Sequence, residues 1–274
     1  MTSFQKLAIA ALLSSTACSP VLWAAQPSAD RYIVKFVPGK AAGARAALSQ
    51  AAGRVALELP AHEAVAVELP AAALAGLSRN PNIEYIEQDV PRYPLALAAP
   101  SDGTPYTSGQ LVPYGIPMVQ ADLVSDSLAG NRKVCIIDSG YQLAHEDLNR
   151  GAGDSSVTGE YDAGTGWWYT DENHHGTHVA GTIAAINNGG GVVGVNANKT
   201  LKLHIIKVFG ADAWAYSSTL TAAVDKCAAA GANVISMSLG GSRSSRTEIS
   251  AFDKYYKRTT NSILAIAAAG NDGS

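Results

Sequence analysis

Residues 133–138 read Lys133-Val-Cys-Ile-Ile-Asp138, an apolar run that ends in an aspartate and is followed by Ser139 and Gly140. A short apolar run bounded by turn residues is typical of a strand buried on both faces of a sheet. Further apolar runs alternate with amphipathic segments, which predicts an α/β fold with a doubly wound, mostly parallel sheet. We expect its strands at 133–138, 201–208, 233–239 and 262–269, and its helices at 176–187, 218–230 and 247–259.

The composition narrows the class of protein. The chain has 274 residues, of which 47% are hydrophobic and 16% charged, and this excludes disordered, collagen-like and coiled-coil proteins. Its 20 basic and 23 acidic residues leave no positive field for a phosphate backbone, so we expect no nucleic-acid partner. Three cysteines are too few for a disulfide scaffold. Cys135 and Cys227 either pair with each other or remain buried and free.

The first residues have the layout of a secretory signal. No charged residue occurs between Lys6 and Asp30, and polar residues together with Pro20 interrupt the apolar stretch. A membrane-spanning helix needs about 20 predominantly apolar residues. We therefore expect a cleavable signal peptide at 1–25, no stable membrane span, and a secreted or periplasmic protein.

A second, smaller unit is predicted at 26–92. Its pattern reads as β-α-β-β-α-β, a small α+β, ferredoxin-like arrangement that occurs in many unrelated proteins and does not itself indicate a function. Its strands are expected at 32–37, 55–59, 64–69 and 83–87, and its helices at 43–52 and 71–78. Residues 93–109 follow, rich in Pro, Ser, Thr and Gly, and we interpret them as a linker and processing region open to proteolysis.

In open α/β sheets, ligand-binding and catalytic residues lie beyond the carboxyl ends of the strands. Asp138 stands at such an end, where a buried carboxylate needs a hydrogen-bond partner, and an imidazole suits it. His174, His175 and His178 begin the following helix. The histidines are alternatively structural, or bind zinc. Zinc proteases, however, place a glutamate beside the first of two histidines four residues apart, and no such glutamate is present here.

The chain also contains four motifs in an order that resembles the subtilisin-like serine proteases. These are Val-Cys-Ile-Ile-Asp138-Ser-Gly, His175-Gly-Thr-His-Val-Ala-Gly, Ser-Met-Ser238-Leu-Gly-Gly and Ala-Ala-Ala-Gly-Asn271. The resemblance covers 110–274, which it identifies as the N-terminal part of a catalytic domain. By the same resemblance, 26–92 is similar to the inhibitory propeptide of secreted members, opening with Tyr-Ile-Val-Lys-Phe and closing with Ile-Glu-Tyr-Ile-Glu-Gln-Asp.

The resemblance implies a role for each matched residue. Asp138 would orient His175 and stabilise its charged form, and His175 would act as general base and then as general acid. Asn271 would donate a hydrogen bond to the developing oxyanion. An extended polypeptide substrate would pair with a strand edge formed by Ser238, Leu239 and Gly240. Small residues beside that strand leave room for a sizeable apolar side chain of the substrate.

The family's nucleophile is expected in a Gly-Thr-Ser-Met-Ala segment downstream of Asn271, and the 274 residues contain no such segment. We therefore expect a longer protease precursor, which would hydrolyse peptide bonds with an Asp-His-Ser triad. The present 274 residues would be inactive on their own. The alternative is a non-catalytic pseudoprotease or a protease-inhibitor binding protein.

A structural calcium ion is a further implication of the resemblance. Calcium takes six to eight oxygen ligands, and the glycine-rich loop at 186–192 offers several carbonyl groups. The expected ligands are the side chains of Gln110, Asp147 and Asn188 and the carbonyl oxygens of Ile186, Gly190 and Val192. A flexible turn without metal is the alternative interpretation of this loop.

The resemblance also implies that 26–92 is an intramolecular chaperone and inhibitor. Its acidic residues Glu84, Glu87 and Asp89 are expected to meet helix N-termini of the catalytic domain, where unpaired amides favour negative charge. Residues 91–109 would then lie through the substrate groove, with a cut before Gln110.

Overall fold

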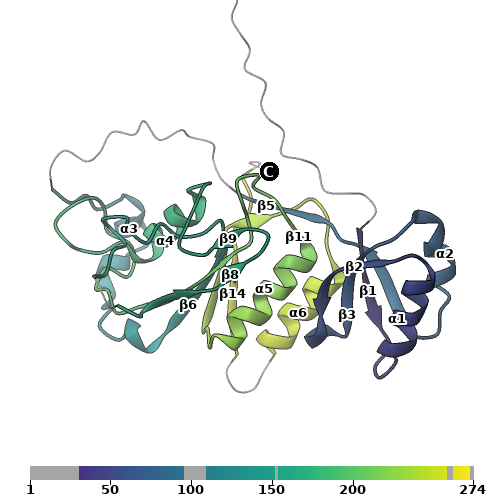
Figure 1. The fold of residues 1–274 in the computed structure, drawn as a ribbon. Helices are drawn as coiled ribbons and strands as arrows, with labels where there is room; N and C mark the ends of the chain where they lie inside the picture. Colours follow the sequence, from purple (N-terminus) through teal and green to yellow (C-terminus); the bar gives the residue numbers. More distant parts are fainter. Residues whose placement is uncertain (1–30, 96–108, 152–153, 258–261, 272–274) are drawn as a thin grey trace, which may run out of the picture.

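The computed structural model describes residues 31–95, 109–151, 154–257 and 262–271. The predicted signal peptide and most of the predicted linker lie outside these ranges. Two separate sheets form the framework, and two long helices lie between them (Figure 1). Among the described residues, no helix has the length and apolar character needed to cross a membrane.

The N-terminal sheet is antiparallel, with strand order β2-β3-β1-β4. This order and the chain order β-α-β-β-α-β confirm the predicted ferredoxin-like arrangement. Its elements are β1 (Arg31–Phe36), α1 (Ala41–Gln50), β2 (Arg54–Leu59), β3 (Ala64–Glu68), α2 (Leu74–Leu77) and β4 (Ile83–Gln88). The predicted helix at 71–78 begins as a tighter 3-10 turn at Ala71–Ala73 before α2.

Alternating side chains of this sheet face two different partners, as the two-residue period of a strand requires. Val34 and Phe36 of β1 pack with Leu48 of α1 in one core. Ile33 points to the opposite face, where its cluster includes Ala222 of the second domain. The N-terminal unit therefore uses one face of its sheet for its own core and the other for docking.

The second sheet has five parallel strands in the order β14-β12-β6-β10-β7. These are β6 (Lys133–Asp138), β7 (Val157–Gly159), β10 (Lys202–Lys207), β12 (Val234–Met237) and β14 (Leu264–Ala267). The main helices are α4 (His175–Ala184), α5 (Ser217–Ala229) and α6 (Arg246–Tyr256). The doubly wound α/β prediction is thus confirmed, with β7 as an edge strand too short to be recognised in the sequence.

The helices cover both faces of this sheet. Ile137 of β6 packs in a core with residues of α5 and α6, and Ile136 packs in another core with residues of α4. In Figure 1, α5 and α6 lie between the second sheet and the N-terminal sheet. The described part of the second domain also contains α3 (Gly115–Met118) and the short strands β8 (Tyr161–Asp162), β9 (Gly166–Trp167), β11 (Ala215–Tyr216) and β13 (Leu239–Gly240).

Helix α4 ends at Ala184, three residues earlier than predicted, because the backbone of the following residues forms a loop. The amide of Ile186 donates to the carbonyl of Asp147 instead of to the carbonyl one helical turn back. Elsewhere the predicted ends differ from the observed ends by only a few residues.

A disulfide joins β6 to α5. Cys135 and Cys227 are bonded, with 5.7 Å between their Cα atoms. The structure therefore selects pairing from the two alternatives that the sequence left open.

Acidic residues of β4 and the loop after it hold the two units together. Glu87 accepts hydrogen bonds from the amides of Arg246 (2.8 Å) and Thr247 (2.9 Å) at the start of α6. Asp89 accepts one from the amide of Ser218 (2.9 Å) at the start of α5. Both are the helix-end contacts expected for these residues. Glu84 instead pairs with the Arg246 guanidinium, at 3.2 Å.

Candidate active site

The end of β6 and the start of α4 bring together Asp138 and His175. The Nδ1 atom of His175 lies 2.8 Å from Oδ1 of Asp138, and the amide of Ser139 donates to the same oxygen at 2.7 Å. Asp138 is completely buried. A buried carboxylate is stable only with such partners, so the two residues have the geometry of a base held by an acid.

Asp171 anchors the first turn of α4 and was not recognised in the sequence. One of its oxygens accepts hydrogen bonds from the Ser139 hydroxyl (2.9 Å) and the His174 amide (2.8 Å). The other accepts from the amide (2.8 Å) and hydroxyl (2.6 Å) of Thr177. Asp171 lies three residues before His174, the N-cap of α4, so the usual N-cap signal in the sequence does not identify it. Because Asp171 holds α4 and the loop after β6 together, it positions His175.

Gly176 permits the close approach of these two segments. Its amide donates to the Ser139 hydroxyl at 2.8 Å, and a Cβ atom at this position would lie 2.4 Å from the carbonyl oxygen of Gly140. Any side chain there would push the start of α4 away from the end of β6. The glycine after the histidine is therefore a packing requirement of the Asp138–His175 pair.

The surroundings favour the charged form of the His175 imidazole. Its hydrogen bond to Asp138 raises the pKa of His175 above its ordinary value, against the lowering effect of burial. The nearby backbone of Leu95 also raises the pKa of His175. A ring that gains a proton readily and holds it against a carboxylate is suited to general-base catalysis.

An extended segment of the same chain lies beside this pair. Strand β5 (Pro91–Pro94) pairs antiparallel with β13 on one side and with β11 on the other. The amide of Leu95 then donates to the carbonyl of Ser238 at 2.9 Å. The three residues predicted to bind substrate, Ser238, Leu239 and Gly240, all take part in these contacts. The predicted substrate-binding strand is therefore paired with residues of the 91–95 segment in this structure.

Leu95 is the residue of this segment closest to the chemistry. Its side chain lies against Gly240, where a Cβ atom would be 3.1 Å from the Leu95 Cδ1 atom. Its backbone lies close enough to His175 to raise the pKa of that imidazole. An apolar side chain of the chain itself thus lies beside the 238–240 strand, and the binding of a substrate side chain there stays a prediction.

Asn271 lies beyond β14, at the same carboxyl edge of the sheet as Asp138. Asn271 is exposed. Among the described residues, no hydrogen bond joins it to Asp138 or His175. The proposed oxyanion role of Asn271 therefore stays a prediction.

The predicted calcium ligands gather around the loop after α4. The Gln110 side-chain nitrogen lies 2.7 Å from the carbonyl oxygen of Ile186 and 3.1 Å from that of Val192. Oδ2 of Asp147 accepts from the Val192 amide at 3.0 Å. In the same loop, the Asn188 side-chain oxygen accepts from the amide of Gly190, also at 3.0 Å.

The donor set fits a hard cation. Oδ1 of Asp147 is buried and has no hydrogen-bond partner in the described structure. The same loop contains the carbonyl oxygens of Ile186 and Val192, which accept from the Gln110 side chain, and such oxygens are the ligands that calcium prefers. Within the described ranges, no group of three or more His, Cys, Asp or Glu side chains is arranged to hold a metal ion. Any cation at the 186–192 loop would therefore depend mainly on carbonyl oxygens.

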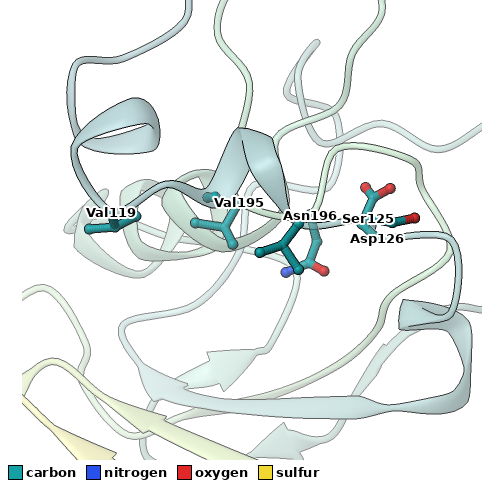
Figure 2. Close-up of a pocket in the computed structure, with 7 residues that line it drawn as sticks. Val119, Ser125, Asp126, Val195 and Asn196 are labelled. Atoms are coloured by element: carbon teal, nitrogen blue, oxygen red, sulfur yellow. The ribbon is translucent and has the colours of Figure 1, made fainter.

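A hollow of about 270 Å³ is shown in Figure 2. Val119, Val195 and Asp126 are among the residues that line it. The Asp126 carboxylate accepts a hydrogen bond from the amide of Asn198 at 3.1 Å, so it serves to hold a loop. None of the predicted site residues lines this hollow, and we assign it no part in the chemistry.

Comparisons with known proteins agree with this arrangement. The family model described as the subtilase family matches residues 130–274. Subtilisin DY of Bacillus licheniformis is 42% identical over 167 residues, which cover 60% of this chain and 57% of that protein. Subtilisin amylosacchariticus of Bacillus subtilis subsp. amylosacchariticus is 34% identical over 250 residues, covering 89% of this chain and 60% of that protein.

A solved structure gives the same result. The psychrophilic subtilisin-like protease Apa1 from the Antarctic Pseudoalteromonas sp. AS-11 superposes with a TM-score of 0.55 at 52% sequence identity. The match covers 60% of this chain and 37% of that one. The chain belongs to the subtilase family, whose members are serine peptidases. It spans 57% and 60% of the lengths of the two curated subtilisins above.

The Asp138–His175 contact predicts how the imidazole titrates. In the 274-residue chain, NMR should find the pKa of His175 above 6.5, and Asp138→Asn should lower it because the charged ring loses its partner. The stabilisation from this contact is present below pH 6.5 and is lost as the pH rises through the raised pKa. Asp253→Asn, which removes an exposed carboxylate from α6, is the control. An unchanged midpoint in Asp138→Asn would contradict the assignment.

Proposed function

We propose that the chain is the N-terminal part of an exported serine endopeptidase precursor, inhibited by its own residues 26–92. The observation that carries this proposal is the placement of 91–95 as an extended strand between β11 and β13, with Leu95 at His175. Antiparallel pairing on both sides is how a cleft holds a peptide through its main chain. Residues 91–95 thus occupy the groove in the manner of a bound substrate.

The proposed reaction is acyl transfer to a serine hydroxyl. The serine oxygen forms a bond to the substrate carbonyl carbon while His175 accepts the hydroxyl proton and Asp138 stabilises the resulting imidazolium. Asn271 donates to the carbonyl oxygen as it becomes negative. The C–N bond then breaks as His175 returns the proton to the leaving amine. Water next attacks the acyl-enzyme, with His175 again accepting a proton and passing it to the serine.

The serine itself is proposed to lie in a later segment of the full-length protein. The 274 residues contain no Gly-Thr-Ser-Met-Ala segment, whereas the other members of the triad are in hydrogen-bonding contact. The hydroxyls of Ser238 and its neighbours in the sequence belong to the substrate strand and its turn. We therefore assign them no nucleophilic role.

Several contacts support an inhibitory and chaperoning role for 26–92. Glu87 and Asp89 satisfy amides at the starts of α6 and α5, and a helix cap of this kind is worth about 1 kcal/mol. The unit would therefore stabilise the two helices that cover one face of the catalytic sheet. The charge-free segment before Asp30 and the Cys135–Cys227 disulfide support export to an oxidising compartment.

The position of Leu95 supports a first processing cut after this residue. Its carbonyl carbon would be the reacting atom, because its amide donates to the carbonyl of Ser238 and its backbone lies close enough to His175 to raise the pKa of the imidazole. This cut lies upstream of the one expected before Gln110. Trimming of the residues in between would follow.

The proposal predicts the activity of two forms of the protein. The 274-residue chain should show no peptide hydrolysis and no labelling by a serine-directed phosphonate, because it has no activated serine. In the full-length protein, His175→Ala should lower kcat by about 10⁶-fold. The control His178→Ala changes an exposed residue one turn further along α4 and should leave kcat within about threefold. Stoichiometric labelling of the 274-residue chain would contradict the proposal.

We also propose that Gln110, Asp147 and the 186–192 loop hold a structural calcium ion. The buried, unpartnered oxygen of Asp147 supports this, because a cation there would satisfy it. When bound, the ion would tie Gln110 to the loop after α4.

Calcium should accordingly stabilise the 274-residue chain. At about 100 times its dissociation constant, a bound ion adds about 2.7 kcal/mol, which corresponds to a rise in Tm of roughly 5–10 °C in thermal unfolding. Asp147→Asn should abolish most of this rise. Glu146→Gln changes the exposed neighbouring carboxylate and should keep it. The same Tm in calcium and in chelator would exclude the site.

A further inference from the structure

We propose that Glu248 makes the substrate groove select a basic side chain, arginine above all, four residues before the cleaved bond. The inference rests on the proposed endopeptidase function and on Leu95 preceding the cleaved bond. Counting back from Leu95, the fourth residue of the bound segment is Arg92.

Arg92 makes an ion pair with Glu248 inside the groove. Its Nη2 atom lies 2.7 Å from Oε2 of Glu248. Both residues are buried, with 5% and 9% of their surfaces exposed. Arg92 reaches this position from β5, where it pairs with Ala215. Glu248 belongs to α6 of the catalytic domain, so the carboxylate remains in the groove when the 26–92 unit leaves.

Apolar side chains lie beside this ion pair. A hollow of about 400 Å³ adjoins Arg92, which is itself one of its lining residues, and Leu220, Leu239 and Phe252 also line it. Gly241 leaves room for the guanidinium, because a Cβ atom there would lie 2.8 Å from the Arg92 Nη1 atom. The pocket thus combines apolar walls with one acidic group at the position of the guanidinium.

The carboxylate needs a cation because it is removed from water. Burial raises the pKa of Glu248, and the hydrogen bond from Arg92 opposes this effect. The Oε1 atom of Glu248 is buried and has no hydrogen-bond partner in the described structure. A neutral or acidic substrate side chain would leave a buried charge unpaired, which is strongly unfavourable. The preference for a basic side chain should therefore come mainly from weak binding of substrates that have no cation to pair with Glu248.

The test uses the processed full-length protease and p-nitroanilides of Arg-Tyr-Pro-Leu, the sequence of residues 92–95. Matched peptides carry citrulline or glutamate in place of arginine, and citrulline keeps the shape while removing the charge. We expect kcat/KM for arginine to exceed that for citrulline by about 30-fold, which equals about 2 kcal/mol. The glutamate peptide should be poorer still.

Variants of Glu248 locate the origin of this preference. Glu248→Gln should bring the arginine and citrulline peptides within about threefold of each other, and Glu248→Lys should favour the glutamate peptide. Asp253→Asn removes an exposed carboxylate from the same helix and should keep the wild-type ratio.

The possible failures are distinct. Cleavage of the arginine and citrulline peptides at equal rates by the wild-type enzyme overturns this inference alone, as does a preference that survives in Glu248→Gln. In those cases the ion pair would serve only to dock the 26–92 unit. No cleavage of any peptide overturns the proposed function and this inference with it.

Discussion

The arrangement of the site depends on one buried carboxylate, Asp138. A charged group at the end of a central strand needs hydrogen-bond donors, and Ser139 and His175 supply two, both to Oδ1 of Asp138. That requirement explains the neighbouring features. Asp171 holds the start of α4 against the loop after β6, and Gly176 lets the two segments touch. The histidine is therefore fixed by the sheet and the helix together.

Contacts between charged groups and their partners also hold the N-terminal unit against the second domain. Glu87 and Asp89 neutralise helix N-termini, and Arg92 neutralises the buried Glu248. These contacts position the segment after β4 in the groove. Leu95 therefore lies near His175, directly after the paired strand β5. If residues 26–92 inhibit the enzyme as proposed, docking and inhibition follow from the same set of contacts.

Much of the framework could be predicted from the sequence because its signals are local. Apolar runs alternating with amphipathic segments defined the sheet, and motif order placed Asp138 and His175 at one edge. Other features depend on distant partners. Strand β5 contains Pro91 and Pro94, which read as turn residues, and its pairing comes from β11 and β13.

Burial of Glu248 and pairing of the cysteines also depend on distant segments. Glu248 reads as a polar residue of a surface helix until Arg92, 156 residues earlier, is placed against it. Cys135 and Cys227 lie 92 residues apart, and only the packing of β6 on α5 brings them together. The periodicity of the sequence reveals neither the Arg92–Glu248 ion pair nor the Cys135–Cys227 disulfide.

We propose that residues 91–95 occupy the groove as a substrate of the protein's own site. Intact-mass analysis of the N-terminal fragment released during maturation of the full-length protein distinguishes this from simple docking. We expect a fragment that ends at Leu95 and that is not formed in His175→Ala expressed in a protease-free host. A fragment that ends at another residue, or one that forms equally in His175→Ala, would mean that residues 91–95 are not cleaved by the protein's own site.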